Sequence, residues 1–366
     1  MFLRTSLAAA AAALILVACG GGDDPAFSYD KVVVFGDSLS DVGTYKVGTV
    51  LAAGGGRWIV NGVPGSEIWV ERVAAGLGLV KPCAAETGLL PNVAGVVGAA
   101  VATQPGCFNY AQGSARITNP LGPNSVALQA VPDANNGGAP TQTLGLMAKP
   151  MQTQMAAHLS AVGGTYTGKE LVTVLAGAND VFMELAFLGT GLGAANPAGA
   201  VANMAAHGTA LGGLIKTQVL AKGAKRVLVL NVPYVSGTPY ARSLDVAQPG
   251  TSALIDQMVT AFNAALAASL TNVAGLRLAD FYTESLTQFN NPGNFGVSNR
   301  DDVACGPNAL SNPPGSPGTA LVCNGTNVIA GNVSRYQYAD NVHPTPYGHQ
   351  LIAEYAQRQL VAAGWN

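Results

Sequence analysis

The stretch that decides the fold is "KVVVFGDSLSDVG", residues 31–43. The run from Val32 to Phe35 is β-branched and aromatic, which is typical of a central strand in a parallel sheet. Gly36, Asp37 and Ser38 then end the strand abruptly. Two interpretations follow: a turn that caps the next helix, or a nucleophilic serine presented at the carboxyl end of a strand. The second interpretation requires partner residues elsewhere in the chain.

The composition predicts one large globular domain. The chain has 366 residues, of which 49% are hydrophobic and only 10% are charged, so it contains enough apolar residues for a sizeable core. Its formal net charge is -2, and no run of basic residues interleaved with aromatic ones occurs. We therefore expect no nucleic-acid partner.

The amino terminus, "MFLRTSLAAAAAALILVAC", has the pattern of an export signal, with Arg4 ahead of an apolar run over 7–17. This run is shorter than the roughly 20 residues that a membrane-spanning helix needs. The residues from Leu16 to Cys19 resemble the lipobox of bacterial lipoproteins. That resemblance implies a signal peptide over 1–18, an acylated Cys19 that holds the protein at a membrane surface, and a flexible tether over 19–29. The mature protein would be an outer-membrane lipoprotein or extracellular.

The other four cysteines are an even number in a protein expected in an oxidising compartment, which favours two disulfides. Three pairings are possible. We prefer Cys83 with Cys107 and Cys305 with Cys323, because each pair closes a local loop. Free buried thiols are the alternative.

Strand and helix patterns alternate along the chain, which predicts an α/β domain over 30–366 with a parallel sheet and helices on both faces. Further strands are expected at 170–180, 224–233 and 276–281, with a short one near 107. Helices are expected at 66–78, 150–163, over about 20 residues ending near 222, at 251–270 and at the carboxyl terminus. Residues 284–336 show little periodicity, and we expect a long irregular insertion there, held by Cys305 and Cys323.

A nucleophilic serine needs a base, and the chain has four histidines. His343 lies in "YADNVHPTPYGH", three residues after Asp340, in a loop that precedes a helix. One tight turn would bring the Asp340 carboxylate to one imidazole nitrogen and leave the other free for the serine. The other histidines, His158, His207 and His349, lie in helical patterns and are expected on helix surfaces.

The serine also needs hydrogen-bond donors for the oxyanion that forms when it attacks a carbonyl. Gly113 follows a short strand, and its backbone N–H is accessible because glycine has no side chain. Asn179 ends the strand pattern "LVTVLAG", so its amide is expected at the same sheet edge as Ser38. Taken singly, such residues are more often caps of the following helix.

Four segments together resemble the ordered motifs of the GDSL family of lipases and esterases, also called SGNH hydrolases. They are "FGDSLSD", "NYAQGSARI", "GAND" and "DNVHPTPYGH", spread over most of the chain. The resemblance implies a three-layer α/β/α sandwich of the flavodoxin-like type. It also implies Ser38 as nucleophile, His343 as base and Asp340 as its orienting carboxylate. The implied oxyanion donors are the Ser38 and Gly113 N–H groups and the Asn179 side chain.

Other features of these motifs limit the resemblance or refine it. Asp37 and Asp180 belong to the motifs without a catalytic role. The motif "GDSLSD" is followed here by Val42, Gly43 and Thr44, whereas many members continue with threonine, glycine and asparagine. The serine does not lie in the G-x-S-x-G pentapeptide of classical α/β-hydrolases.

The sequence therefore predicts a serine esterase or lipase that works through an acyl-enzyme, with neither a metal nor an organic cofactor. An acyltransferase that passes the acyl group to an alcohol would use the same residues. A surface lipoprotein that binds a glycan or lipid through a degenerate site is a third interpretation. The sequence leaves open whether the ester is a lipid, an acetylated glycan or a polyester, and it leaves the oligomeric state open.

Overall fold

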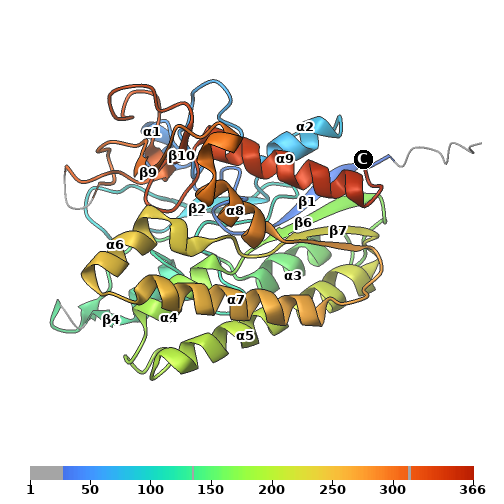
Figure 1. Ribbon diagram of the computed structural model, residues 1–366, viewed down its shortest axis with the longest axis horizontal. Helices are drawn as coiled ribbons and strands as arrows, with labels where there is room; N and C mark the ends of the chain where they lie inside the picture. Colours follow the sequence, from blue (N-terminus) through green and yellow to red (C-terminus); the bar gives the residue numbers. More distant parts are fainter. Residues whose placement is uncertain (1–27, 134–135, 312–314) are drawn as a thin grey trace, which may run out of the picture.

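The computed structural model describes residues 28–133, 136–311 and 315–366, and the expected signal peptide and Cys19 lie outside these ranges. A four-stranded parallel sheet in the order β1–β6–β7–β8 forms the centre (Figure 1). Its strands are β1 (Lys31–Gly36), β6 (Glu170–Leu175), β7 (Arg226–Leu230) and β8 (Leu276–Ala279). On the free side of β1, Val34 forms a parallel bridge with Asn109. The expected short strand near residue 107 is thus reduced to one bridge beside β1.

Helices cover both faces of the sheet, which confirms the predicted three-layer arrangement (Figure 1). One face packs against α2 (Trp69–Gly76) and α9 (Pro346–Ala362), and the other against α3 (Met151–Ala161), α5 (Pro197–Leu214) and α7 (Thr251–Ser269). The valines of β1 alternate between these two cores, because successive side chains of a strand point to opposite faces. Val33 and Phe35 join the α3, α5 and α7 side, whereas Val32 and Val34 join the α2 and α9 side.

Shorter elements complete the described structure. The helices are α1 (Gly48–Ala52), α4 (Ala178–Ala186), α6 (Pro239–Ala247) and α8 (Phe281–Asn290). The two-stranded pairs are β2 (Glu86–Leu89) with β3 (Ala99–Thr103), β4 (Pro132–Asp133) with β5 (Ala139–Pro140), and β9 (Asn299–Val303) with β10 (Tyr336–Tyr338).

The segment 284–336 is more regular than expected. Helix α8 extends to Asn290, and β9 pairs in parallel with β10. The sequence of α8, "FYTESLTQFN", is rich in β-branched and aromatic residues that favour helix only weakly, so its last turns are difficult to recognise from the sequence. Longer loops, broken by single 3₁₀ turns, make up the rest of the described segment.

Both preferred disulfides are present. Cys83 is bonded to Cys107, and Cys305 to Cys323. Disulfides are typical of exported and extracellular proteins. In the described residues no helix is long and apolar enough to cross a membrane.

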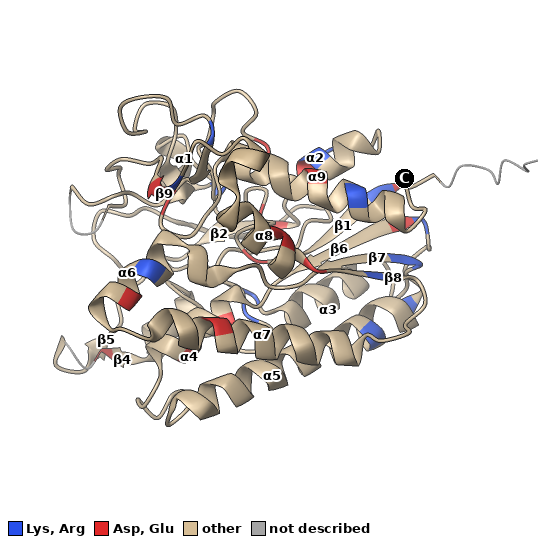
Figure 2. Ribbon diagram, viewed as in Figure 1, with Lys and Arg blue, Asp and Glu red and all other residues tan. Residues whose placement is uncertain are grey.

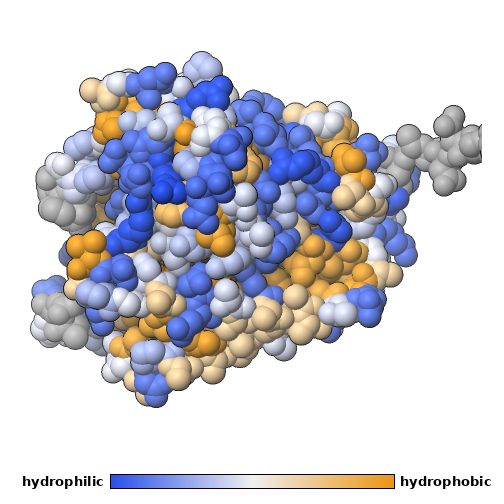
Figure 3. Space-filling view, in the orientation of Figure 1, coloured by the Kyte–Doolittle hydropathy of each residue, from blue (hydrophilic) through white to orange (hydrophobic). Residues whose placement is uncertain are grey.

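The surface carries few charges, and its acidic and basic residues are dispersed among uncharged ones in the view of Figure 2. Along α5 and α7 the exposed face is only weakly hydrophobic (Figure 3), because these helices are rich in alanine and glycine.

Two of the three histidines expected on helix surfaces are instead buried. His158 is 1% exposed, and His349 is fully buried. His158 lies on the same side of α3 as Met151 and Met155, which precede it by seven and three residues. This helical spacing places it toward the core. His207, on α5, is partly exposed as expected, with 18% of its side chain accessible.

Candidate active site

Ser38 lies in the turn that follows β1, at the carboxyl edge of the sheet. The carboxylate of Asp37 accepts a hydrogen bond from the Leu39 N–H (3.0 Å), and the Asp37 carbonyl accepts one from the Ser40 N–H (3.0 Å). These two bonds reverse the chain within one turn and present Ser38 at the surface of a cavity. Asp37 is itself buried in the cavity wall, and burial raises the pKa of its carboxyl to about 7.

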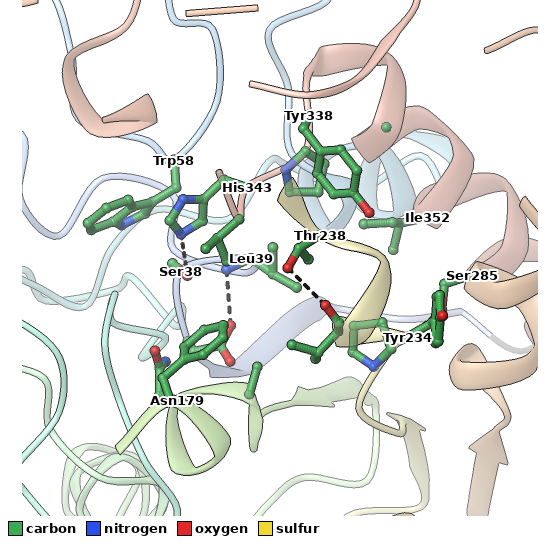
Figure 4. Close-up of a pocket in the computed structure, with 18 of the residues that line it drawn as sticks. Ser38, Leu39, Trp58, Asn179, Tyr234, Thr238, Ser285, Tyr338, His343 and Ile352 are labelled. Atoms are coloured by element: carbon green, nitrogen blue, oxygen red, sulfur yellow. Dashed lines mark hydrogen bonds between the residues drawn. The ribbon is translucent and has the colours of Figure 1, made fainter. Parts of the chain in front are cut away.

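The structure brings Ser38, His343 and Asp340 together in one hydrogen-bonded chain. Figure 4 shows its first link, between Ser38 and His343. Nε2 of His343 lies 2.9 Å from Oγ of Ser38, although 305 residues separate them. Nδ1 of His343 lies 2.9 Å from each carboxylate oxygen of Asp340. This is the order of groups that activates a serine: the carboxylate fixes the imidazole, and the imidazole faces the hydroxyl.

Backbone donors hold Asp340 in place. Its carboxylate accepts from the N–H groups of Ala320 (2.7 Å), Val342 (2.9 Å) and His343 (2.8 Å). Burial acts to raise the pKa of this carboxyl, but His343 and the backbone donors outweigh burial and leave the pKa below its ordinary value. Asp340 is therefore ionised at neutral pH. Ala320 belongs to the loop closed by the Cys305–Cys323 disulfide, so this loop helps to hold Asp340.

Trp58 lies against the imidazole of His343, with ring centroids 4.6 Å apart and planes tilted by 31° (Figure 4). The indole thereby restricts the orientation of the imidazole, in addition to the hydrogen bonds between its Nδ1 and Asp340. Sequence reasoning missed Trp58, because no motif surrounds it and nothing in its own segment indicates a contact with a residue 285 positions later (343 minus 58).

Asn179 is in the first turn of α4, directly after β6, and lines the same cavity as Ser38 (Figure 4). Gly177 starts this helix with φ of +123°, a conformation that side chains disfavour. One hydrogen of the Asn179 amide is donated to the carbonyl of Ala115 (3.0 Å). A primary amide has two hydrogens, so the second remains for a group in the cavity.

Gly113 does not have the expected position. Its N–H donates to Oδ2 of Asp41 (3.0 Å), and the residue does not line the cavity. The expectation that this N–H is an oxyanion donor is therefore corrected. A Cβ at Gly113 would lie 2.5 Å from Nε1 of Trp58, so close packing of the indole accounts for the glycine.

The next residue, Ser114, lines the cavity instead. Its φ is +70°, which is uncommon for a residue with a side chain. Within the described residues no group accepts a hydrogen bond from the N–H of Ser114 or of Ser38. Both N–H groups are therefore available to a ligand. The sequence favoured Gly113 over Ser114 as an oxyanion donor only because Gly113 is a glycine. It carries no signal of the positive φ of Ser114.

The cavity continues beyond Ser38 as an apolar pocket. Figure 4 shows Ser38 and His343 on one side of it and Tyr234 and Ser285 on the other. Its volume is about 210 Å³. The hydrophobic residues that line it include Leu39, Phe182, Val235, Phe281, Phe289, Val342 and Ile352. Among the described residues, no group of three His, Cys, Asp or Glu side chains is arranged to hold a metal ion.

Comparison with known proteins assigns the family. Residues 32–356 match the model of the GDSL-like lipase/acylhydrolase family. The chain belongs to this family. It is a carboxylic ester hydrolase, as the resemblance of its motifs implied, and the match covers all the segments that form the site.

Solved structures with a related arrangement have low sequence identity to the hydrolase. One is an alpha/beta hydrolase enzyme, LAE5, from the metagenome of Lake Arreo, Spain, with 14% identity and a TM-score of 0.40, covering 93% of this chain and 97% of that one. Another is phospholipase A1 from Streptomyces albidoflavus NA297, with 12% identity and a TM-score of 0.39, covering 91% and 100%. A search of curated proteins found no match.

Proposed function

We propose that the hydrolase cleaves esters through an acyl-enzyme on Ser38, with His343 as general base and Asp340 as the group that orients it. The observation that carries this proposal is the hydrogen-bonded chain from Ser38 Oγ through both nitrogens of His343 to Asp340, with 2.9 Å at each step. A base must lie within about 3.2 Å of the proton that it takes, and Nε2 of His343 meets that condition.

The reaction then proceeds in two halves. Nε2 of His343 takes the proton of Ser38 as Oγ attacks the ester carbonyl, and the carbonyl oxygen becomes an oxyanion. His343 returns the proton to the leaving alkoxide, which departs as an alcohol. A water molecule next attacks the acyl-enzyme and gives a proton to His343. His343 returns this proton to Oγ of Ser38 as the bond to the acyl group breaks, which releases the acid and regenerates the serine hydroxyl.

Three donors would stabilise the oxyanion: the N–H groups of Ser38 and Ser114 and the free hydrogen of the Asn179 amide. All three residues line the cavity. Asn179 and Asp180 also lie in the first turn of α4, where the helix dipole is positive. Such preorganised donors commonly contribute about 10²- to 10³-fold each to kcat.

The pocket favours an ester with an apolar acyl group, because its walls beyond Ser38 are mainly aromatic and aliphatic.

We further propose that the protein acts after export, at a membrane surface through acylated Cys19 or in the medium. The two disulfides support export, and the sequence of residues 1–19 supports the anchor.

Substitution of Ser38 tests the nucleophile. Ser38→Ala should abolish both hydrolysis of short aryl esters and covalent labelling by a fluorophosphonate, while the circular dichroism spectrum stays unchanged. Ser243→Ala, at an exposed serine on α6, should behave like the wild type. Labelling that persists in Ser38→Ala would place the nucleophile elsewhere.

Product analysis separates a hydrolase from an acyltransferase. Free acid should remain the product when an alcohol acceptor is added; an ester of that alcohol would instead identify an acyltransferase.

A further inference from the structure

The donors Ser114 and Asn179 belong to different segments of the chain, and Asn179 itself makes one hydrogen bond to the Ser114 segment among the described residues. This bond is the one from the Asn179 amide to the carbonyl of Ala115. Ser114 lies in a loop with no regular structure and has an unfavourable backbone angle, φ +70°. Contacts with other parts of the chain must therefore hold this loop against α4, because the backbone preference of Ser114 does not.

A buried ion pair directly behind the two donors provides that link. Arg116 follows Ser114 by two residues, and Asp180 is the residue after Asn179. Nε of Arg116 lies 2.9 Å from Oδ1 of Asp180, and the N–H of Ile117 donates to Oδ2 of the same carboxylate (3.1 Å). One carboxylate on α4 thus holds both the backbone and a side chain of the Ser114 segment.

The pair is out of contact with water, since the side chains of Arg116 and Asp180 are 3% and 0% exposed. Burial raises the pKa of the Asp180 carboxyl, and the guanidinium of Arg116 opposes that shift. Buried ion pairs are often no more stabilising than apolar side chains of similar volume. A gain in stability therefore explains this pair poorly, whereas the fixed direction of its hydrogen bonds explains it well.

We propose that the Arg116–Asp180 ion pair positions Ser114 and Asn179 relative to each other and so sets the geometry of the oxyanion hole. This inference rests on the proposed function of the two donors. Arg116 and Asp180 touch neither the ester nor the reacting atoms; they are positioning residues. The proposal gives a task to Asp180, which the family motif includes without a catalytic role.

The first test is Asp180→Asn. The amide oxygen can still accept from Ile117, but the substitution removes the nearer of the two carboxylate charges beside Arg116. Because a displacement of about 1 Å can cost roughly 10² in rate, we expect kcat to fall about 10- to 100-fold. KM should stay within about twofold, since neither Arg116 nor Asp180 lines the pocket. A kcat within about threefold of the wild type would overturn the proposal.

Glu184→Gln is the matched control. Glu184 lies one turn further along α4, also contacts the guanidinium of Arg116 (3.5 Å), and accepts from Asn203 (3.0 Å). It is therefore part of the same buried network, but its hydrogen bonds and ion pairs within the described residues go to Arg116, Asn203 and His207 rather than to Ser114 or Asn179. Its kcat should stay within about threefold of the wild type. A fall as large as that of Asp180→Asn would show that any disturbance of the network has this effect, and would overturn the specific role of the pair.

A double variant separates positioning from stability. Asp180→Asn alone leaves the buried charge of Arg116 with only the Glu184 carboxylate, at 3.5 Å, so it destabilises the fold, and Arg116→Met combined with it removes that charge. The melting temperature of the double variant should recover toward the wild-type value while kcat stays low. Recovery of kcat together with the melting temperature would show a merely structural role.

A measurement that needs no activity completes the test. Amide hydrogen exchange of residues 113–117 and 178–181 should be faster in Asp180→Asn than in Glu184→Gln. If the wild type hydrolyses no ester and Ser38 is not labelled, the proposed function fails, but faster exchange would still establish the link between the segments. Unchanged exchange in Asp180→Asn would overturn the link whatever the activity.

Discussion

Among the single residues around Ser38, Asn179 offers the most direct test of the oxyanion hole, because its amide contributes through a side chain. Asn179→Ala should lower kcat by about 10² to 10³ and leave KM little changed, since this donor acts most strongly on the charge of the transition state. Steady-state kinetics with a short aryl ester measures both values.

Ser114→Gly is the control for this prediction. Glycine keeps the backbone N–H and adopts a φ of +70° without strain, so kcat should stay within about twofold and stability should rise by about 1 kcal/mol. A large loss of kcat in Ser114→Gly would show that the hydroxyl, rather than the N–H, serves the site. Equal kcat in Asn179→Ala and the wild type would remove Asn179 from the oxyanion hole.

At this scale the sequence predicts side-chain chemistry better than backbone geometry. The contacts of Ser38, His343 and Asp340 were predictable because their residue types and motif order specify their chemistry. The sequence does not indicate whether Gly113 or Ser114 has its N–H free at the cavity. The answer depends on the φ of Ser114 and on the hydrogen bond from Gly113 to Asp41, 72 residues away. Trp58 was missed for a similar reason: its contact with His343 arises only from tertiary packing.

At the scale of elements, α8 determines how far the acyl pocket extends. Phe289, in its last turn, lines the pocket and packs against Tyr234 with ring centroids 5.4 Å apart. Phe289→Ala should open this end and shift the optimum of kcat/KM toward acyl chains longer by two or more carbons. Phe289→Trp should shift it toward shorter chains. A series of aryl esters from acetate to palmitate measures the optimum.

Acetate esters are the internal control for these variants, because an acetyl group ends close to Ser38 and far from Phe289. Both variants should hydrolyse acetate at close to the wild-type rate. If neither variant moves the chain-length optimum, the acyl group binds in another direction from Ser38.

The elements of the sheet were predictable where local pattern and burial agree. The valine runs of β1, β6 and β7 are buried on both faces, and such strands have continuous apolar sequences. By contrast, the partner of β1 at Asn109 makes only one bridge. The end of α8 was missed because its residues have weak helix preferences and its packing is against the active-site pocket. Tertiary contacts stabilise these two elements, and a sequence pattern does not report them.

For the whole molecule, buried His158 predicts loss of stability in acid. Four aromatic rings surround it, Phe35, Phe108, Tyr110 and Tyr166, and neither ring nitrogen has a partner within the described residues. Burial lowers its pKa from 6.5 to about 4. Between about pH 4 and pH 6.5, His158 therefore binds a proton in the unfolded chain but not in the folded protein. The contribution of neutral His158 to the free energy of unfolding is fully present above pH 6.5 and declines as the pH falls toward 4, by up to about 3 kcal/mol.

His158→Leu isolates this effect. Between pH 7 and pH 5 the wild type should lose about 2 kcal/mol more of its free energy of unfolding than the variant, measured by urea denaturation. The comparison cancels other titrating groups, including Asp37 with its raised pKa. Equal losses in the two proteins would show that His158 accepts a proton in the folded state.

The distance along the chain between Ser38 and His343 also has a consequence for biosynthesis. Ser38, the proposed nucleophile, lies in the first described strand-to-helix turn, whereas His343, the proposed base, precedes only the last described helix, α9, which packs against α2, β7 and β8. A ribosome that stalls, or a protease that removes the carboxyl-terminal tenth, leaves a serine without its base. On the proposed mechanism, ester hydrolysis therefore reports that synthesis has passed His343.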